Sequence, residues 1–325
     1  MSSATISRKR AGRGFAYYAG DKRITDSETL AYIDSLVIPP AWTNVEIATN
    51  KRAKVQASGI DAAGRKQAIY HPSFRRARET QKFERILQFG KALPKLRRQV
   101  ERDLSRRRWH PDKVNALIVK LMDETYFRIG NETYAKAHET YGITTMRSKH
   151  LDITTSSVTF DFTGKSGKQH HKTISDRRVA RLVKQLDDMP GYELFRYIDA
   201  DNQQRQVRSS DVNEYIKRHM GDDFSAKDFR TWGGTLLASM LLTQNPRGTT
   251  EAERKKHVTS CIKSVAKELG NTPAVTRSSY VDPRIIDRYM KGNSLSEVAE
   301  TLRTMRPRAF VSNEERCLLA QLNET

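Results

Sequence analysis

The sequence predicts an α+β protein, with a small β-rich N-terminal domain (residues 1–78) and a larger, mainly helical domain (residues 79–325) that contains a β-hairpin. Short aromatic or β-branched runs, separated by turn signals, fill the first 70 residues. Apolar residues recur at helical spacing after residue 75. Near residue 165, a tip rich in glycine and lysine lies between two β-rich arms.

In the first domain, we expect no ordered structure over residues 1–10, which are rich in Ser and Arg. The runs GFAYYAG, VEIATN and AKVQASG predict strands over 14–20, 45–50 and 53–59. A short helix is expected over 26–36. Glycine and proline pairs separate these segments, as in a small sheet with tight turns.

In the second domain, apolar residues at helical spacing predict a long helix over 75–108. Pro94 lies inside it and is expected to divide or open the helix, because proline lacks the N–H that the helix needs. Further helices are predicted by the same periodicity over 115–129, 211–220, 235–242, 251–269 and 282–290.

The predicted hairpin has arms at 152–162 and 169–174 and the tip sequence GKSGK at 164–168. This tip imitates the end of a phosphate-binding loop, but Thr159 stands where that motif needs glycine, and no helix follows. We therefore expect no nucleotide site. His170 and His171 are adjacent in a strand and point to opposite faces, so they are expected at the hairpin surface or against DNA, and not on one metal ion.

The charge of the chain indicates a nucleic-acid partner. Its 58 Lys and Arg residues exceed its 38 Asp and Glu residues, giving a net charge of +20 and a pI near 10.0. Two cysteines without metal-ligand spacing, and no carboxylate cluster for magnesium, predict neither metal nor cofactor. No signal peptide or long apolar run is present, so we expect a cytoplasmic, nucleoid-associated protein without a membrane segment.

Metal-free strand transfer at a phosphodiester needs three kinds of side chain. A nucleophile attacks phosphorus, cationic donors stabilise charge on the non-bridging oxygens, and an acid protonates the leaving oxygen. Arginine matches phosphate with its fork of donors, and lysine is suited to the acid role. Tyrosine is suited to the nucleophile role because its phosphate ester can be attacked again by the free hydroxyl.

Four segments provide these residue types: RIGNETY at 128–134, TGKSGK at 163–168, KDFRTW at 227–232 and GNTPAVTRSSYVDP at 270–283. Their order and spacing resemble the type IB DNA topoisomerases, in their poxvirus-like and bacterial branch. The resemblance implies that Tyr280 is the nucleophile and Lys165 the general acid. It also implies that the scissile phosphate is bound by Arg128, Arg230 and Asn271.

The N-terminal segments IPPAW, GIDAAGRKQ and YHP also resemble the small domain of this family. The resemblance implies a monomer that closes around duplex DNA as a C-shaped clamp and needs neither ATP nor metal. Lys227 and Lys168 are expected to contact DNA. Asn271 occupies a position that is His in the poxvirus enzymes, and its amide can donate a hydrogen bond but cannot become charged.

Two alternatives share parts of this pattern. A tyrosine recombinase uses the same residue types, but it usually has His three residues before its second Arg, where this chain has Lys227. A non-catalytic DNA-binding protein would show the same salt-dependent affinity without ever becoming covalently attached to DNA.

Overall fold

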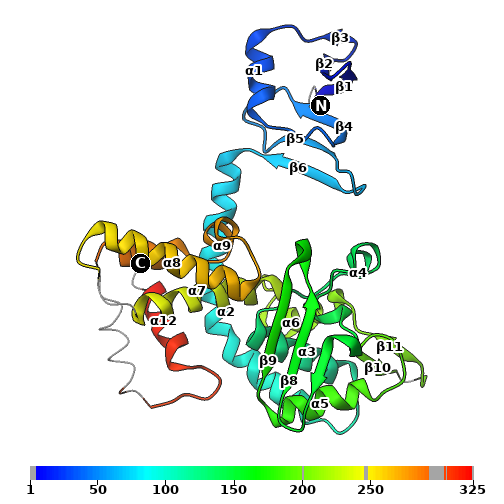
Figure 1. Ribbon diagram of the computed structural model, residues 1–325, viewed down its shortest axis with the longest axis vertical. Helices are drawn as coiled ribbons and strands as arrows, with labels where there is room; N and C mark the ends of the chain where they lie inside the picture. Colours follow the sequence, from blue (N-terminus) through cyan, green and yellow to red (C-terminus); the bar gives the residue numbers. More distant parts are fainter. Residues whose placement is uncertain (1–4, 200, 245–247, 293–303, 305, 324–325) are drawn as a thin grey trace. The chain divides into compact units, whose positions relative to one another are not determined.

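The computed structural model describes residues 5–199, 201–244, 248–292, 304 and 306–323. The chain forms two compact units, Met1–Lys82 and Phe83–Thr325, so the structure is mixed α/β with an N-terminal sheet and a mainly helical remainder (Figure 1). The division falls inside α2 (Pro72–Leu104), which begins in the first unit and continues in the second.

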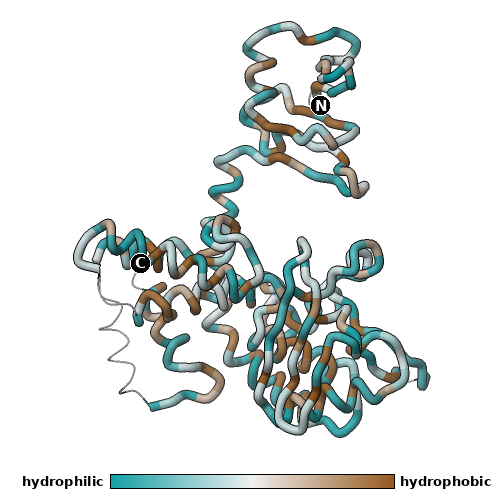
Figure 2. The backbone as a smooth tube through the Cα atoms, viewed as in Figure 1, coloured by the Kyte–Doolittle hydropathy of each residue, from teal (hydrophilic) through white to brown (hydrophobic). Residues whose placement is uncertain are grey.

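The N-terminal unit is a six-stranded antiparallel sheet with the strand order β3-β2-β1-β4-β5-β6. Ile33 of helix α1 packs with Ile6, Val45, Ile47 and Ala57 of the strands, and brown hydrophobic segments alternate with teal ones along them (Figure 2). Alternation of hydrophobic and polar residues along the strands is typical of a sheet with one buried face. The elements are β1 (Thr5–Ala11), β2 (Gly14–Ala19), β3 (Lys22–Arg23), α1 (Ser27–Ser35), β4 (Thr43–Ala48), β5 (Val55–Ile60) and β6 (Lys66–Tyr70).

The prediction that residues 1–10 have no ordered structure is wrong for residues 5–10, which belong to β1; residues 1–4 lie outside the described part. β1 pairs with β2 on one side and β4 on the other, and its Ile6 is buried. Arg8 donates to the carbonyls of Pro39 and Trp42. Composition alone could not show that these charged residues find such partners.

The second unit surrounds one large core that includes Phe89, Leu117 and Trp232. After α2 its elements are α3 (Pro111–Thr125), α4 (Glu132–His138), β7 (Leu151–Ile153), β8 (Val158–Thr163), β9 (Gln169–Ile174), α5 (Arg177–Asp187), β10 (Arg196–Ile198), β11 (Gln204–Gln206), α6 (Ser209–Met220), α7 (Ala226–Gln244), α8 (Glu251–Leu269), α9 (Pro273–Ser279), α10 (Pro283–Met290) and α12 (Asn313–Asn323). None of the described helices combines the length and apolar character that crossing a membrane requires.

Pro94 does not divide α2, contrary to the prediction. The neighbouring Leu93 and Leu96 are almost completely buried in the core. A proline inside a helix costs about 3 kcal/mol, because it removes one hydrogen bond and crowds the preceding turn. Burial of two leucines contributes about 1.5–3 kcal/mol each, which is enough to keep the helix continuous.

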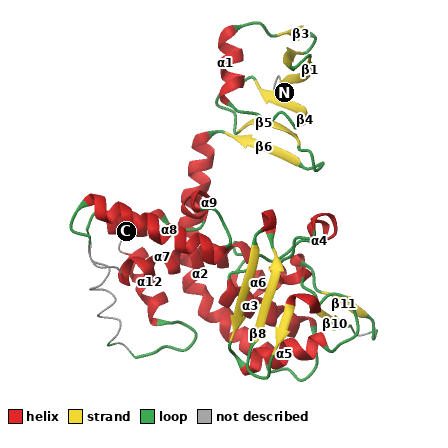
Figure 3. Cartoon of the chain, in the orientation of Figure 1, coloured by secondary structure: helices red, strands yellow, loops and turns green. Residues whose placement is uncertain are grey.

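The hairpin is part of a three-stranded antiparallel sheet with the order β7-β8-β9, and α5 packs against β7 and β8 (Figure 3). The arm predicted over 152–162 is two strands, because a turn at Thr154–Ser157 separates β7 from β8. The second arm, 169–174, is β9 as predicted. The short pair β10–β11 lies in a domain that was expected to be mainly helical, with the hairpin as its predicted β structure.

A buried ionic network attaches the C-terminal helix α12 to the core. Arg97 of α2 donates to both carboxylate oxygens of Asp123 and of Glu315, at distances of 2.6–2.9 Å. Glu315 also accepts from the indole of Trp232, which lies two residues after Arg230 in α7. Although burial opposes the charged form of Glu315, its bonds to Arg97 lower the pKa of this carboxyl.

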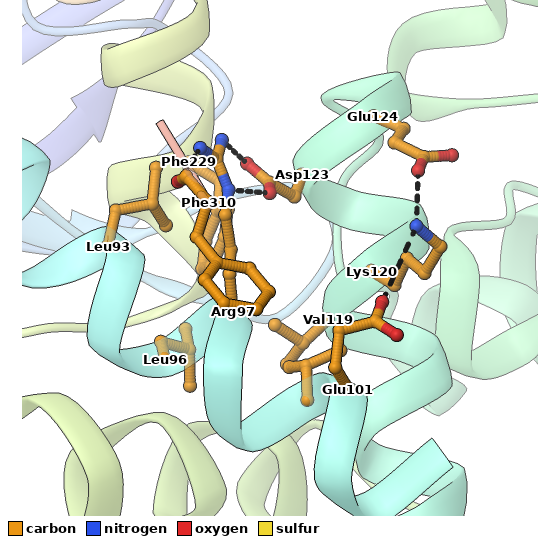
Figure 4. A pocket seen from close by; sticks show the side chains of 11 residues that line it. Leu93, Leu96, Arg97, Glu101, Val119, Lys120, Asp123, Glu124, Phe229 and Phe310 are labelled. Carbon is orange, nitrogen blue, oxygen red and sulfur yellow. Dashed lines mark hydrogen bonds and ion pairs between the residues drawn. The ribbon is translucent and has the colours of Figure 1, made fainter. Parts of the chain in front are cut away.

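Beside this network lies a cavity of about 280 Å³, lined by residues of α2 and α3 together with Phe229 and Phe310 (Figure 4). Its charged side chains already pair with one another: Arg97 with Asp123, and Lys120 with Glu124. No residue implicated in strand transfer lines this cavity. Duplex DNA needs an open surface, so this cavity is not the candidate functional site.

Replacing Glu315 with Ala should leave the Arg97 charge partly uncompensated and lower the free energy of unfolding by about 3 kcal/mol. Urea unfolding monitored by circular dichroism measures this change. Glu314→Ala is the matched control, because Glu314 is the exposed neighbour on the same helix. Equal stability of the two variants would show that the network does not stabilise the fold.

Candidate active site

Arg128 lies just beyond the end of α3. Tyr126 caps the helix in a left-handed conformation (φ 57°), and residues 127–131 then connect it to α4. The carbonyl of Arg128 accepts from the amide of Ile143 at 2.9 Å. A side chain at Gly142 would meet that carbonyl at 2.6 Å, so glycine is required for this close approach. The arginine backbone is therefore fixed by the segment that follows α4.

Arg230 lies in α7 and is only 3% exposed. Its Nη1 donates to the carbonyl of Tyr126, at the end of α3, and its Nη2 donates to the carbonyl of Leu269, at the end of α8, at 2.7 Å. Burial, and next the charge of Arg128, lower the pKa of Arg230 to about 10, so the guanidinium remains protonated at neutral pH.

Asn271 follows the α8 cap, where Gly270 is left-handed (φ 60°), as is usual for a helix C-terminus. Its side-chain oxygen accepts from Nη2 of Arg128 at 2.5 Å. Two other donors of this pair, Nη1 of Arg128 and Nδ2 of Asn271, are buried and have no hydrogen-bond partner among the described residues. Leaving buried donors unpaired costs about 1–3 kcal/mol each, so both are suited to binding an anion.

Tyr280 ends α9, and its ring lies 5.1 Å from the guanidinium carbon of Arg230. A side chain at Gly234 of α7 would come within 2.5 Å of the Tyr280 carbonyl, so this approach also needs glycine. Burial opposes ionisation of the phenol. The charges of Arg230 and Arg128, with a smaller contribution from Lys165, outweigh burial and lower the pKa of this phenol below its ordinary value.

Lys165 lies at the exposed tip between β8 and β9, where Ser166 and Gly167 are both left-handed (φ 62° and 70°). Its charge acts on Tyr280, so the structure brings the two residues within electrostatic reach. The five residues predicted to act in catalysis therefore come from four separate segments into one region. Lys168 and Lys227 are exposed; Lys227 does not share the buried environment of Arg230, although only three residues separate them.

His170 differs from the prediction, because its side chain is buried and not at the hairpin surface; His171 is exposed. The alternation of strand residues predicts that one of this pair points inward, but not which one or what it meets. Within the described residues, no three His, Cys, Asp or Glu side chains gather as they would to hold a metal ion.

A sheet domain followed by a helical unit, with a tyrosine beside two arginines, is the arrangement of an enzyme that transfers a DNA strand to tyrosine. Comparison with known families supports this class. Residues 71–305 match the family model described as eukaryotic DNA topoisomerase I, catalytic core, and residues 14–61 match the model of the bacterial DNA topoisomerase IB N-terminal domain.

Individual relatives agree with the family models. The chain is 34% identical to DNA topoisomerase 1B of Acanthamoeba polyphaga mimivirus over 293 residues, 87% of each chain. It is 26% identical to DNA topoisomerase 1B of vaccinia virus (strain Copenhagen) over 75% of each chain. It is also 24% identical to DNA topoisomerase 1 of Mycosarcoma maydis over 53% of this chain and 18% of that protein. The chain belongs to the type IB DNA topoisomerases, in their poxvirus-like branch, and is therefore an isomerase of DNA topology.

The lowered pKa of Tyr280 can be tested by nuclear magnetic resonance on protein labelled with carbon-13 at the tyrosine ζ carbon. Tyr280→Phe identifies the signal, which should titrate below the ordinary tyrosine value. In Arg230→Ala, loss of the positive charge should move this titration to higher pH. A Tyr280 titration that does not respond to Arg230→Ala would show that the two groups are not coupled.

Proposed function

We propose that this chain relaxes supercoiled duplex DNA through transient cleavage of one strand, with Tyr280 as the nucleophile. The observation that supports these residue roles is the pair of buried, unpartnered donors on Arg128 and Asn271, close to the guanidinium of Arg230. A phosphodiester between these groups would satisfy both donors. The same positive charge lowers the pKa of Tyr280 and so favours the phenolate that attacks.

In the proposed reaction, the phenolic oxygen of Tyr280 forms a bond to phosphorus and the bond from phosphorus to the 5′-oxygen breaks. The 3′ end becomes a phosphotyrosyl ester, and the other strand end leaves as a 5′-hydroxyl. Arg128, Arg230 and Asn271 would stabilise the charge that develops on the non-bridging oxygens. Lys165 would donate the proton that the leaving oxygen requires.

Religation reverses these steps. The 5′-hydroxyl attacks the phosphotyrosyl ester, the phosphodiester forms again, and the tyrosine is released. The ester keeps the phosphodiester in activated form, so the cycle needs no ATP. Torsion in the supercoiled DNA would drive rotation of the free end between cleavage and religation.

We further propose that the β-rich domain (1–78) and the helical domain (79–325) of a single monomer close around the duplex as a clamp. Affinity would come mainly from phosphate contacts by basic side chains, which include the exposed Lys168 and Lys227. Such contacts provide little sequence information and make binding depend strongly on salt. An enzyme with this substrate would act at the nucleoid of a bacterial cell.

Relaxation of a negatively supercoiled plasmid in EDTA without ATP tests the overall proposal. The wild-type chain should relax the plasmid, whereas Tyr280→Phe should not, because it lacks the attacking oxygen. Tyr192→Phe, at an exposed tyrosine, is the matched control and should relax at the wild-type rate. Relaxation by Tyr280→Phe would exclude Tyr280 as the nucleophile, and strand exchange between two duplexes would indicate a recombinase.

The general-acid role of Lys165 predicts a substrate-dependent defect. Lys165→Ala should slow cleavage of an ordinary strand by about a hundredfold or more, within the range typical of general acids. A strand with a sulfur in place of the 5′-bridging oxygen needs no proton on departure, so its cleavage should recover. Lys168→Ala, at the other lysine of the same tip, should affect both strands equally, because its proposed phosphate contact does not depend on the leaving atom. Equal defects of Lys165→Ala on both strands would contradict this role.

A further inference from the structure

The side chain of His170 is 9% exposed and points into the second unit from β9. Its neighbour His171 points the other way and lies 3.2 Å from Asp161 at the surface. The ring of His170 stacks on Phe162 with a centroid distance of 5.0 Å and meets Phe127 edge-on at 5.5 Å. The reaction proposed above gives this buried ring no role.

Two glycines approach the remaining edge of the ring. A side chain at Gly164 would lie 2.6 Å from Cδ2 and 2.7 Å from Nε2 of His170. A side chain at Gly270 would lie 2.4 Å from Cε1 and 2.9 Å from Nε2. Both glycines are therefore in close contact with the imidazole. The ring fills the space between the hairpin tip and the C-terminal cap of α8.

Three residues that the ring contacts come directly before a candidate site residue in the sequence. Gly164 precedes Lys165, and Gly270 precedes Asn271. Phe127, which the ring meets edge-on, precedes Arg128. Consecutive Cα atoms are only about 3.8 Å apart, so a shift of any of these contacts moves the next residue with it.

The charges around His170 keep the ring neutral. Burial, and then the charges of Arg128, Arg230 and Lys172, lower its pKa to about 4. At neutral pH the imidazole therefore occupies this strongly positive region without adding a further positive charge. The ring needs no hydrogen bond or ion pair to separate Gly164 from Gly270, because its size alone sets the distance between them.

We propose that His170 is a positioning residue, whose ring sets the distance between the Lys165 hairpin and the Arg128–Asn271 pair. The inference rests on the proposed role of Lys165 as general acid. His170 does not touch the reacting phosphate in this proposal. It acts through Gly164 on one side and through Gly270 and Phe127 on the other.

Single-turnover cleavage of a strand with either oxygen or sulfur at the 5′-bridging position tests this inference. His170→Ala should slow cleavage of the oxygen strand by about a hundredfold, as expected when a catalytic group is displaced by about 1 Å. The cleavage rate of His170→Ala should recover in part on the sulfur strand, because Lys165 is one of the displaced groups. Its DNA affinity should stay within about twofold of wild type, since phosphate contacts by surface cations supply most of the affinity.

His171→Ala is the matched control, because it removes the adjacent, exposed imidazole; it should cleave both strands at the wild-type rate. A wild-type rate for His170→Ala would overturn the inference. So would an equal loss on both strands, because the defect would then not pass through Lys165.

Gly164→Ala provides a second test that leaves His170 in place. Gly164 has φ −94°, which alanine adopts without strain, so only the contact with the ring changes. The added methyl group should displace the hairpin and slow cleavage of the oxygen strand. In the His170→Ala background the obstructing ring is absent, so Gly164→Ala should cause little further loss. If Gly164→Ala slows cleavage equally with and without His170, and the variants unfold at the wild-type temperature, the inference is overturned.

The two proposals can fail separately. If Lys165→Ala is not rescued by the sulfur strand, the general-acid role fails and the inference loses its basis. If Lys165→Ala is rescued but His170→Ala cleaves at the wild-type rate, the general-acid role stands and the positioning role of His170 is wrong.

Discussion

The site depends on one buried guanidinium that joins two helix ends. Arg230 donates to the carbonyl of Tyr126, where α3 ends, and to the carbonyl of Leu269, where α8 ends. Helix C-termini have unpaired carbonyls and partial negative charge, so a buried cation between two of them is well compensated. Arg128 and Asn271 each follow one of these carbonyls by two residues. These two bonds of Arg230 therefore also determine the separation of the two chain segments that carry Arg128 and Asn271.

This arrangement places like charges close together. Arg128 lowers the pKa of Arg230, and both lower the pKa of Tyr280. Repulsion of this kind opposes folding, so the surrounding structure must compensate for it. The compensation comes from the rigid elements around α7: Trp232 is bonded to Glu315 of α12, and Ser239 is bonded to Gln321 of the same helix. A negatively charged group, such as a phosphate or a phenolate, would relieve this repulsion.

Much of the site could be predicted from sequence, because its residues lie in short segments whose order and spacing are specific to the family. The roles of Arg128 and Lys165 stay predictions, but their proximity to Tyr280 is a property of the fold. The N-terminal strand and the continuity of α2 through Pro94 could not be predicted, since tertiary partners decide both. The burial of His170 and its contacts could not be predicted for a related reason. Alternation along a strand shows that one of two adjacent residues points inward, but not that it meets two glycines from distant segments.

The position of Asn271 shows how this charge environment limits the choice of side chain. The resemblance to the poxvirus enzymes implies histidine at this position in those enzymes, and a charged imidazolium is a stronger donor than an amide. In this fold, however, burial and the charges of Arg128 and Arg230 already lower the pKa of His170 to about 4, and the ring of His170 contacts Gly270. An imidazole at position 271 would meet the same positive charge, which disfavours its charged form. A neutral imidazole has one N–H and the amide nitrogen has two, so neither group needs a charge to donate to a phosphate. Asparagine at this position therefore changes the reach and geometry of the donor, and its amide donates equally well across the pH range.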